Sequence, residues 1–396
     1  TAYEVTSSLV GSEMCIRDRL SIAYMLMVGM AAGWVLRKLR LPSLAGMILT
    51  GILLGPYALD LIDGSILGIS AELRKIALII ILMRAGLSLD VDDLKRVGRP
   101  AVLMCFVPAC FEILGMLVLA PRLLGITVLE AAIMGSVVAA VSPAVIVPKM
   151  IRLMEEGYGT DNSIPQLILA GASVDDVFVI VLFSAFTGLA QGGRVSPVSF
   201  VQIPGSILAG ILIGCGAGVL LALYFKQVHI RDTVKVIILL CISFILVTLE
   251  DSLKGAFTFS SLISVMCMGI SLQKRRGPVA MRLSVKFNKL WVGAEILLFV
   301  LVGATVDVSY AVSAGAAVIL LILGVLVFRM AGVMCCLVRT RLSLKERLFC
   351  MVAYMPKATV QAAIGGVPLS MGLACGNIVL TVAVLSIPVS YTHLRA

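Results

Sequence analysis

Two adjacent aspartates interrupt a long apolar segment over residues 164–190, in the sequence Ala170-Gly171-Ala172-Ser173-Val174-Asp175-Asp176-Val177-Phe178-Val179-Ile180. The segment is longer than the roughly 20 apolar residues that a helix needs to cross the hydrocarbon core of a bilayer. A charged side chain near the centre of such a helix costs at least about 2.5 kcal/mol, and charges in this position usually mark a functional site. The pair Asp175-Asp176 is therefore predicted to lie inside a membrane and to bind an ion.

The composition of the whole chain agrees with a membrane protein. Of its 396 residues, 60% are hydrophobic and 14% are charged, and the mean hydropathy is +1.10. A soluble globular protein is about half apolar and about a quarter charged. The net charge of +10 comes from basic residues between the apolar runs, such as Arg37-Lys38-Leu39-Arg40, where they orient a chain in a membrane rather than bind nucleic acid. The fold class is predicted to be an all-α polytopic membrane protein.

The apolar runs predict about 13 transmembrane helices. They cover residues 20–36, 43–59, 71–89, 100–120, 127–150, 164–190, 200–225, 232–249, 256–272, 289–308, 311–338, 346–371 and 374–390. Basic residues gather in the connections that follow odd-numbered spans, which the positive-inside rule places in the cytoplasm. The chain is thus predicted to be a multi-pass protein of the cell (inner) membrane, with its N-terminus outside and its C-terminus in the cytoplasm.

Similar segments recur seven spans apart. Phe111-Glu112-Ile113-Leu114-Gly115 in span 4 matches Phe328-Arg329-Met330-Ala331-Gly332 in span 11, and prolines interrupt span 5 at Ser142-Pro143 and span 12 at Pro356-Lys357. An offset of an odd number of spans gives the two halves opposite orientations in the membrane. Two inverted repeats, each with a broken helix, are typical of secondary transporters, whose broken helices surround the ion site.

The polar residues of these spans form a candidate ion site. Adjacent carboxylates disfavour each other's ionisation and burial disfavours the charged form, so the pair Asp175 and Asp176 is predicted to exchange a proton for a cation. The Ser142 hydroxyl and the carbonyl groups freed by the interruptions are further oxygen ligands. Three residues are predicted to compensate charge: Arg329 as the counter-ion of Asp175, Glu112 at the corresponding position of the other half, and Lys357 beside the helix ends of span 12.

Other classes of protein fit the sequence less well. The ten cysteines show no pairing or metal-ligand spacing, so neither disulfides nor a metal centre is expected. No cofactor is expected, and no glycine-rich nucleotide-binding loop is present. A sodium-coupled solute symporter of related fold is an alternative. An intramembrane aspartyl protease is disfavoured because side chains of consecutive residues on one helix point about 100° apart.

The motifs resemble those of the monovalent cation:proton antiporter superfamily, which includes the sodium/proton exchangers. The resemblance covers roughly residues 20–390. It rests on Leu41-Pro42-Ser43-Leu44-Ala45-Gly46 with Gly51-Ile52-Leu53-Leu54-Gly55-Pro56, on Ser142-Pro143, on Ala172-Ser173-Val174-Asp175-Asp176, on Arg329 and on Pro356-Lys357. It implies a transporter and not an enzyme, which exchanges Na⁺, or alternatively Li⁺ or K⁺, for protons. It also implies that Asp176 carries the ion, and that the protein is a homodimer in the lipid bilayer with no nucleic-acid or nucleotide partner.

The resemblance further implies a division of the chain into a scaffold and a mobile ion-carrying part. Scaffold helices are expected over 20–99 and 231–308, ion-transport helices over 100–190 and 309–390, and a linker helix over 191–230. The ends, at 1–19 and 391–396, are expected to be a non-native leader and tail.

The resemblance does not decide the transport stoichiometry. Electrogenic members of the superfamily have a lysine where this chain has Arg329, and electroneutral members have a glutamate where it has Gly171. The stoichiometry therefore stays open, as do the cation and the physiological role.

Overall fold

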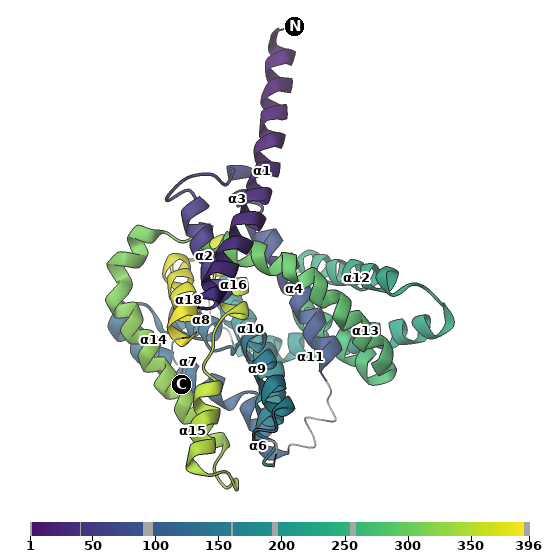
Figure 1. The fold of residues 1–396 in the computed structure, drawn as a ribbon, viewed down its shortest axis with the longest axis vertical. Helices are drawn as coiled ribbons and strands as arrows, with labels where there is room; N and C mark the ends of the chain where they lie inside the picture. The colour runs from purple at the N-terminus through teal and green to yellow at the C-terminus, as the bar shows by residue number, and fades with distance from the viewer. Residues whose placement is uncertain are drawn as a thin grey trace.

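The computed structural model describes residues 2–39, 41–89, 98–159, 161–191, 197–253 and 259–391, and every regular element in these ranges is a helix (Figure 1). The predicted tail, apart from Tyr391, lies outside the described residues. The helices are α1 (Ala2–Lys38), α2 (Ser43–Leu54), α3 (Gly64–Gly68), α4 (Ser70–Ser88), α6 (Arg99–Met104), α7 (Val107–Leu124), α8 (Val128–Val138), α9 (Pro143–Glu155), α10 (Ile164–Gln191), α11 (Pro197–Gln227), α12 (Asp232–Ser252), α13 (Ser261–Ala304), α14 (Val308–Cys336), α15 (Leu344–Ala353), α16 (Thr359–Ile364), α17 (Val367–Ser370) and α18 (Gly376–Tyr391).

Six helical segments within the described ranges are long and apolar enough to cross a membrane. They are Arg17–Lys38, Arg99–Leu124, Leu208–Gln227, Asp232–Ser252, Ser261–Ala304 and Gly315–Cys336, and shorter apolar helices such as Val128–Val138 and Gly376–Ser390 occur elsewhere in the chain. The predicted class, an all-α polytopic membrane protein, is therefore confirmed. Helix α1 also contains most of the predicted leader, and its N-terminal part projects from the body of the molecule (Figure 1).

Two breaks interrupt the helices near predicted spans. The spans 256–272 and 289–308 are predicted to be separate, and they lie on the two sides of a kink in α13, where Arg276, just before Gly277-Pro278, has a non-helical backbone (φ −140°, ψ 54°). The predicted span 100–120 is itself divided at Cys105 and Phe106 into α6 and α7. Pro108 explains this second break, because a proline lacks the amide hydrogen that would extend the helix from α6.

The helices pack in two groups. One contains α1, α2, α4, α11 and α12, which pack around the long helix α13. The other contains α6 to α10 and α14 to α18, in which α7 lies along α14 and α8 contacts α7, α10 and α18. Figure 1 shows α11, α12 and α13 on the opposite side of α10 from α14 and α15. Segments far apart in the sequence thus meet in each group.

Glycines bring α2 and α13 into backbone contact. A Cβ atom added to Gly51 would lie 2.0 Å from the carbonyl oxygen of Val300, and one added to Gly303 would lie 2.2 Å from that of Ile48. Helices in lipid gain no hydrophobic driving force from meeting each other, so close contact through small residues is a main source of their association.

Replacing Gly51 with alanine is expected to lower the stability of the protein by about 1–3 kcal/mol, the usual cost of overpacking a close contact. The thermal unfolding midpoint of the purified protein in detergent measures the effect. Gly293→Ala is the matched control, because this helical glycine of α13 has no atom within 4 Å of an added Cβ. Equal unfolding midpoints for the two variants would contradict the proposed contact.

Candidate functional site

Two helix interruptions form the centre of the site. Helix α8 ends at Val138 and α9 begins at Pro143, while α15 ends at Ala353 and α16 begins at Thr359. Pro143 and Pro356 explain the interruptions, because a proline donates no backbone hydrogen bond and disfavours the helical conformation of the residue before it. The helices that lead into the interruptions also begin alike, with capping boxes formed by Thr127 and Glu130 for α8 and by Ser343 and Glu346 for α15.

The two interruptions touch each other. The backbone N–H of Ser142 donates a hydrogen bond to the carbonyl oxygen of Pro356 at 2.8 Å. The side chain of Gln361 adds two more links, because its Nε2 donates to the carbonyl oxygens of Val138 (3.0 Å) and Ala140 (2.8 Å). Its Oε1 accepts from the N–H of Ala358 (2.8 Å) within the second interruption. Backbone groups that lost their helical partners are thereby satisfied inside the protein.

Arg329 of α14 is the central cation of the site, and its side chain is fully buried. It donates to the Asp175 carboxylate at 3.1 Å and to the Glu112 carboxylate at 2.7 Å. It also donates to the carbonyl oxygens of Ala139, just after α8, and of Tyr354, just after α15. One guanidinium thus compensates two buried carboxylates and the negative ends of both helices that lead into the interruptions.

Lys357 contacts a different partner from the one expected. Its Nζ donates to the Glu112 carboxylate at 2.6 Å, and its backbone N–H donates to the hydroxyl of Ser390 at 2.9 Å. The hydrogen bonds to the carbonyl groups after α8 and α15 come from Arg329, and the role predicted for Lys357 beside the helix ends stays a prediction. Glu112 therefore lies between two cations, Arg329 and Lys357, and all three side chains are fully buried.

The close approach of α7 and α14 depends on one glycine in each helix. A Cβ atom added to Gly115 of α7 would lie 2.7 Å from the ring of Phe328, and one added to Gly332 of α14 would lie 3.0 Å from Cβ of Phe111. The phenylalanine of each helix thus packs against the glycine of the other helix. This reciprocal contact brings Glu112, next to Phe111, within reach of Arg329, next to Phe328.

The two aspartates of α10 have different surroundings. Asp175 is fully buried, and its Oδ2 accepts hydrogen bonds from Arg329 and from the backbone N–H of Val141 (2.8 Å). Asp176 is 8% exposed, and its Oδ1 has no hydrogen-bond partner among the described residues. The helical rotation of about 100° between consecutive residues explains why the two carboxylates cannot share one set of partners.

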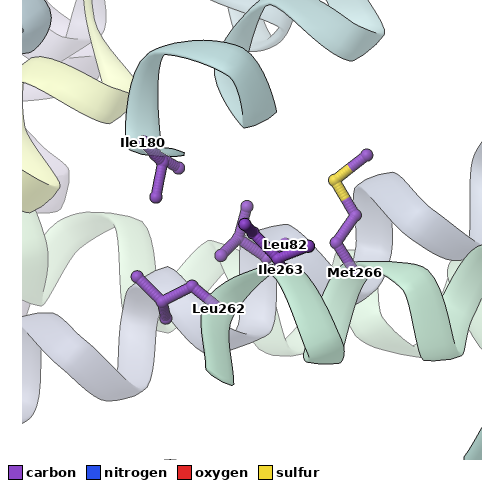
Figure 2. A pocket seen from close by; sticks show the side chains of 5 residues that line it. All are labelled: Leu82, Ile180, Leu262, Ile263 and Met266. Atoms are coloured by element: carbon purple, nitrogen blue, oxygen red, sulfur yellow. The ribbon is translucent and has the colours of Figure 1, made fainter. Parts of the chain in front are cut away.

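The face of α10 that carries Asp176 turns toward the other group of helices. Ile180 follows Asp176 by four residues and therefore lies on nearly the same face. Figure 2 shows Ile180 opposite Leu82 of α4 and residues of α13, across a narrow apolar gap lined by Leu82, Ile180, Leu262, Ile263 and Met266. Asp176 thus lies one helical turn from an apolar boundary between the two groups.

Several buried oxygens of the site have no hydrogen-bond partner among the described residues. They are Oδ1 of Asp175, Oδ1 of Asp176, the Ser142 hydroxyl, the Thr359 hydroxyl and Oε1 of Glu112. An unpartnered buried oxygen is costly, and native structures contain few of them. Such oxygens, carried by the elements that meet at the interruptions, can bind a proton or a dehydrated cation.

Sequence reasoning missed three residues: Tyr354, Gln361 and Thr359. The ring of Tyr354 lies against the Arg329 guanidinium, whose central carbon is 5.0 Å from the ring centroid. The tyrosine hydroxyl donates to the carbonyl of Met104 at 2.9 Å. A Cβ at Gly171 would lie 2.8 Å from that hydroxyl, so the tyrosine fills the space beside this glycine. The available signal was the presence of polar residues next to Pro356 in an otherwise apolar segment.

Comparison with known proteins gives consistent matches over almost the whole chain. Residues 23–392 match the family model "Sodium/hydrogen exchanger, transmembrane". The chain is 33% identical over 372 residues to sodium/hydrogen exchanger 9B2 of Mus musculus and 32% identical over 371 residues to that of Homo sapiens. These alignments cover 88% of this chain, which spans 65% and 66%, respectively, of the lengths of the two relatives.

A solved structure also shares the fold. The sodium proton antiporter MjNhaP1 from Methanocaldococcus jannaschii superimposes with a TM-score of 0.83, covering 95% of each chain at 20% sequence identity.

Proposed function

The chain belongs to the sodium/hydrogen exchanger family, and on that premise we propose that it exchanges a monovalent cation, Na⁺ in the first place, for protons across a membrane. This family consists of transporters rather than enzymes, and membership confirms the resemblance that the motifs indicated. The proposed exchange proceeds by alternating access, with Li⁺ and K⁺ as further candidate cations.

The unequal surroundings of Asp175 and Asp176 carry this proposal. Arg329 and the N–H of Val141 hold Asp175, so its charge is compensated by fixed protein groups. Asp176 makes no such fixed contact with a cationic side chain of the described residues, and it faces the boundary between the helix groups. We assign the carried ion to Asp176, with the Ser142 hydroxyl as a further ligand, because a carboxylate without a fixed counter-ion can take either a proton or a metal cation. Arg329, Lys357 and Glu112 set the charge around it.

The proposed architecture is that of two inverted repeats of broken-helix type within about 13 membrane spans. The paired interruptions after α8 and α15, their matching capping boxes and the reciprocal contacts of Gly115 and Gly332 support it. The group around α13 would be the scaffold, with α11 as the linker. The group that contains α10 and α14 would move against it, across the apolar gap beside Ile180.

The proposed setting is the cell (inner) membrane, with the N-terminus outside and the C-terminus in the cytoplasm, and a homodimer as the working unit. Exposed apolar side chains such as Leu212, Leu220 and Met27 support contact with lipid or with a second copy. Their large exposed fractions would be unfavourable in water.

Proton flux in reconstituted vesicles tests the function. Vesicles with an acidic interior, containing a pH-sensitive dye, receive Na⁺, Li⁺, K⁺ or choline outside, with and without a clamped membrane potential. We expect interior alkalinisation with at least one alkali cation and none with choline. A change of rate on clamping would indicate net charge movement. Equal flux with all four cations would contradict the proposed exchange.

A further inference from the structure

Buried hydroxyl groups in this protein usually have a partner in their own helix. Thr50 donates to the carbonyl of Gly46, Ser243 to that of Leu239 and Thr381 to that of Asn377, each four residues earlier. The hydroxyls of Ser142 and Thr359 lack any partner among the described residues although the two side chains are 0% and 2% exposed.

The positions of these two hydroxyls are related. Ser142 is the last residue of the first interruption, directly before α9, and Thr359 is the first residue of α16, directly after the second interruption. The segments contact each other through the hydrogen bond from Ser142 N–H to the Pro356 carbonyl. Gln361, in the same turn as Thr359, contacts the carbonyls of Val138 and Ala140. The first turn of α16 therefore lies against the first interruption.

Polar groups near Thr359 bind other partners, so its hydroxyl has no hydrogen-bond partner in the part of the chain that the structure describes. Lys357 is bound to Glu112, and the N–H of Ala358 is bound to Gln361. The Thr359 hydroxyl could have bonded to a carbonyl three or four residues earlier in a continuous helix, but the interruption removes that acceptor geometry. A hydroxyl oxygen has two lone pairs, and a desolvated monovalent cation provides a partner that the described residues do not.

We propose that the hydroxyl oxygen of Thr359 is a ligand of the transported monovalent cation, so that the ion binds between the two interruptions with oxygens from both. Asp176 and Ser142 supply the ligands from α10 and the first interruption, and Thr359 supplies one from the second. This inference rests on the proposed exchange function. It predicts that the bound cation contacts both interruptions at once, because neither of them supplies all of the oxygen ligands.

Thr359→Val, which removes the hydroxyl at nearly constant volume, tests the inference in the full chain reconstituted into vesicles. The Na⁺ concentration for half-maximal proton flux is expected to rise about ten-fold, the effect of losing one contact to a charged group. Thr359→Ser keeps the hydroxyl and is expected to stay close to the unaltered protein. The matched control is Thr381→Val, whose buried hydroxyl has its own carbonyl partner.

A second measurement separates ligand loss from a structural defect. Na⁺ that binds the folded protein raises its thermal unfolding midpoint in detergent. We expect this Na⁺-dependent shift to decrease in Thr359→Val and to persist in Thr359→Ser and Thr381→Val. If Thr359→Val does not fold, Thr359→Ala serves for both measurements. An unchanged half-saturating Na⁺ concentration and an unchanged shift would overturn the role of Thr359 while leaving the exchange function intact. Absence of cation-dependent flux in the unaltered protein would overturn the exchange function itself.

Discussion

Asp176→Asn is expected to reduce cation-driven proton flux to the level of protein-free vesicles. This result is expected because asparagine keeps the size and shape of the side chain but cannot be deprotonated, so it cannot exchange a proton for a cation. Among the described residues no cationic side chain is fixed to Asp176, and its replacement should leave the folded structure intact. The measurement is the initial rate of alkalinisation at saturating Na⁺. This rate is divided by the amount of folded protein in the vesicles, and a cooperative unfolding transition identifies the protein as folded.

Two further aspartate variants sharpen this prediction. Asp232→Asn is the matched control: this aspartate lies at the start of α12 and pairs with Lys235 and Arg282, outside the site, so exchange should persist. Asp175→Asn removes a carboxylate that Arg329 and Val141 hold, and it should reduce the rate less than Asp176→Asn does. Substantial exchange by Asp176→Asn would refute the assignment of this residue as the carrier.

Arg329→Gln is expected to destabilise the protein by about 3–5 kcal/mol, the usual effect of removing one partner from a buried ion pair. The substitution leaves the Asp175 carboxylate without its cation and Glu112 with Lys357 alone. The carbonyls of Ala139 and Tyr354 lose their donor as well. The thermal unfolding midpoint and the yield of monodisperse protein in detergent measure the loss.

The control for Arg329 is Arg282→Gln. Arg282 also pairs with an aspartate, Asp232, at 2.9 Å, but its side chain is 55% exposed, and exposed pairs contribute about 0–1 kcal/mol. Arg329→Lys should lie between the two, because an ammonium group keeps the charge but lacks the fork that reaches four acceptors. An unfolding midpoint of Arg329→Gln equal to that of Arg282→Gln would show that the buried network does not stabilise the fold.

The family and the general fold are predictable from the sequence because lipid imposes simple rules. Apolar runs long enough to span a bilayer are found by their length, and a charge inside such a run is conspicuous because of its cost. For the same reason Asp175, Glu112, Arg329 and Lys357 can be selected from their positions in the apolar runs alone. Prolines at 143 and 356 mark both interruptions, since their effect on a helix is local.

The partners of these residues are less predictable because they depend on how separate helices cross. Lys357 pairs with Glu112, and Arg329 reaches carbonyls of two different interruptions, contacts that follow only from the packing of α7, α8, α14 and α15. Gln361 and Thr359 resemble ordinary polar residues in sequence, and their importance arises from the meeting of the two interruptions. The helical backbone on both sides of the kink at Arg276 is not predicted, because a run of basic residues, Lys274-Arg275-Arg276, resembles a loop.

The position of Arg329 in the chain also constrains biogenesis. Its two carboxylate partners, Glu112 and Asp175, are synthesised 217 and 154 residues earlier. Because a membrane protein enters the bilayer from its N-terminus onward, both acids arrive before the cation that neutralises them. A nascent chain that ends before α14 lacks the cation that pairs with both acids, so these two ion pairs can form only after α14 has been synthesised. The buried ion pairs therefore make the folding of the first half of the chain depend on the synthesis of the second half.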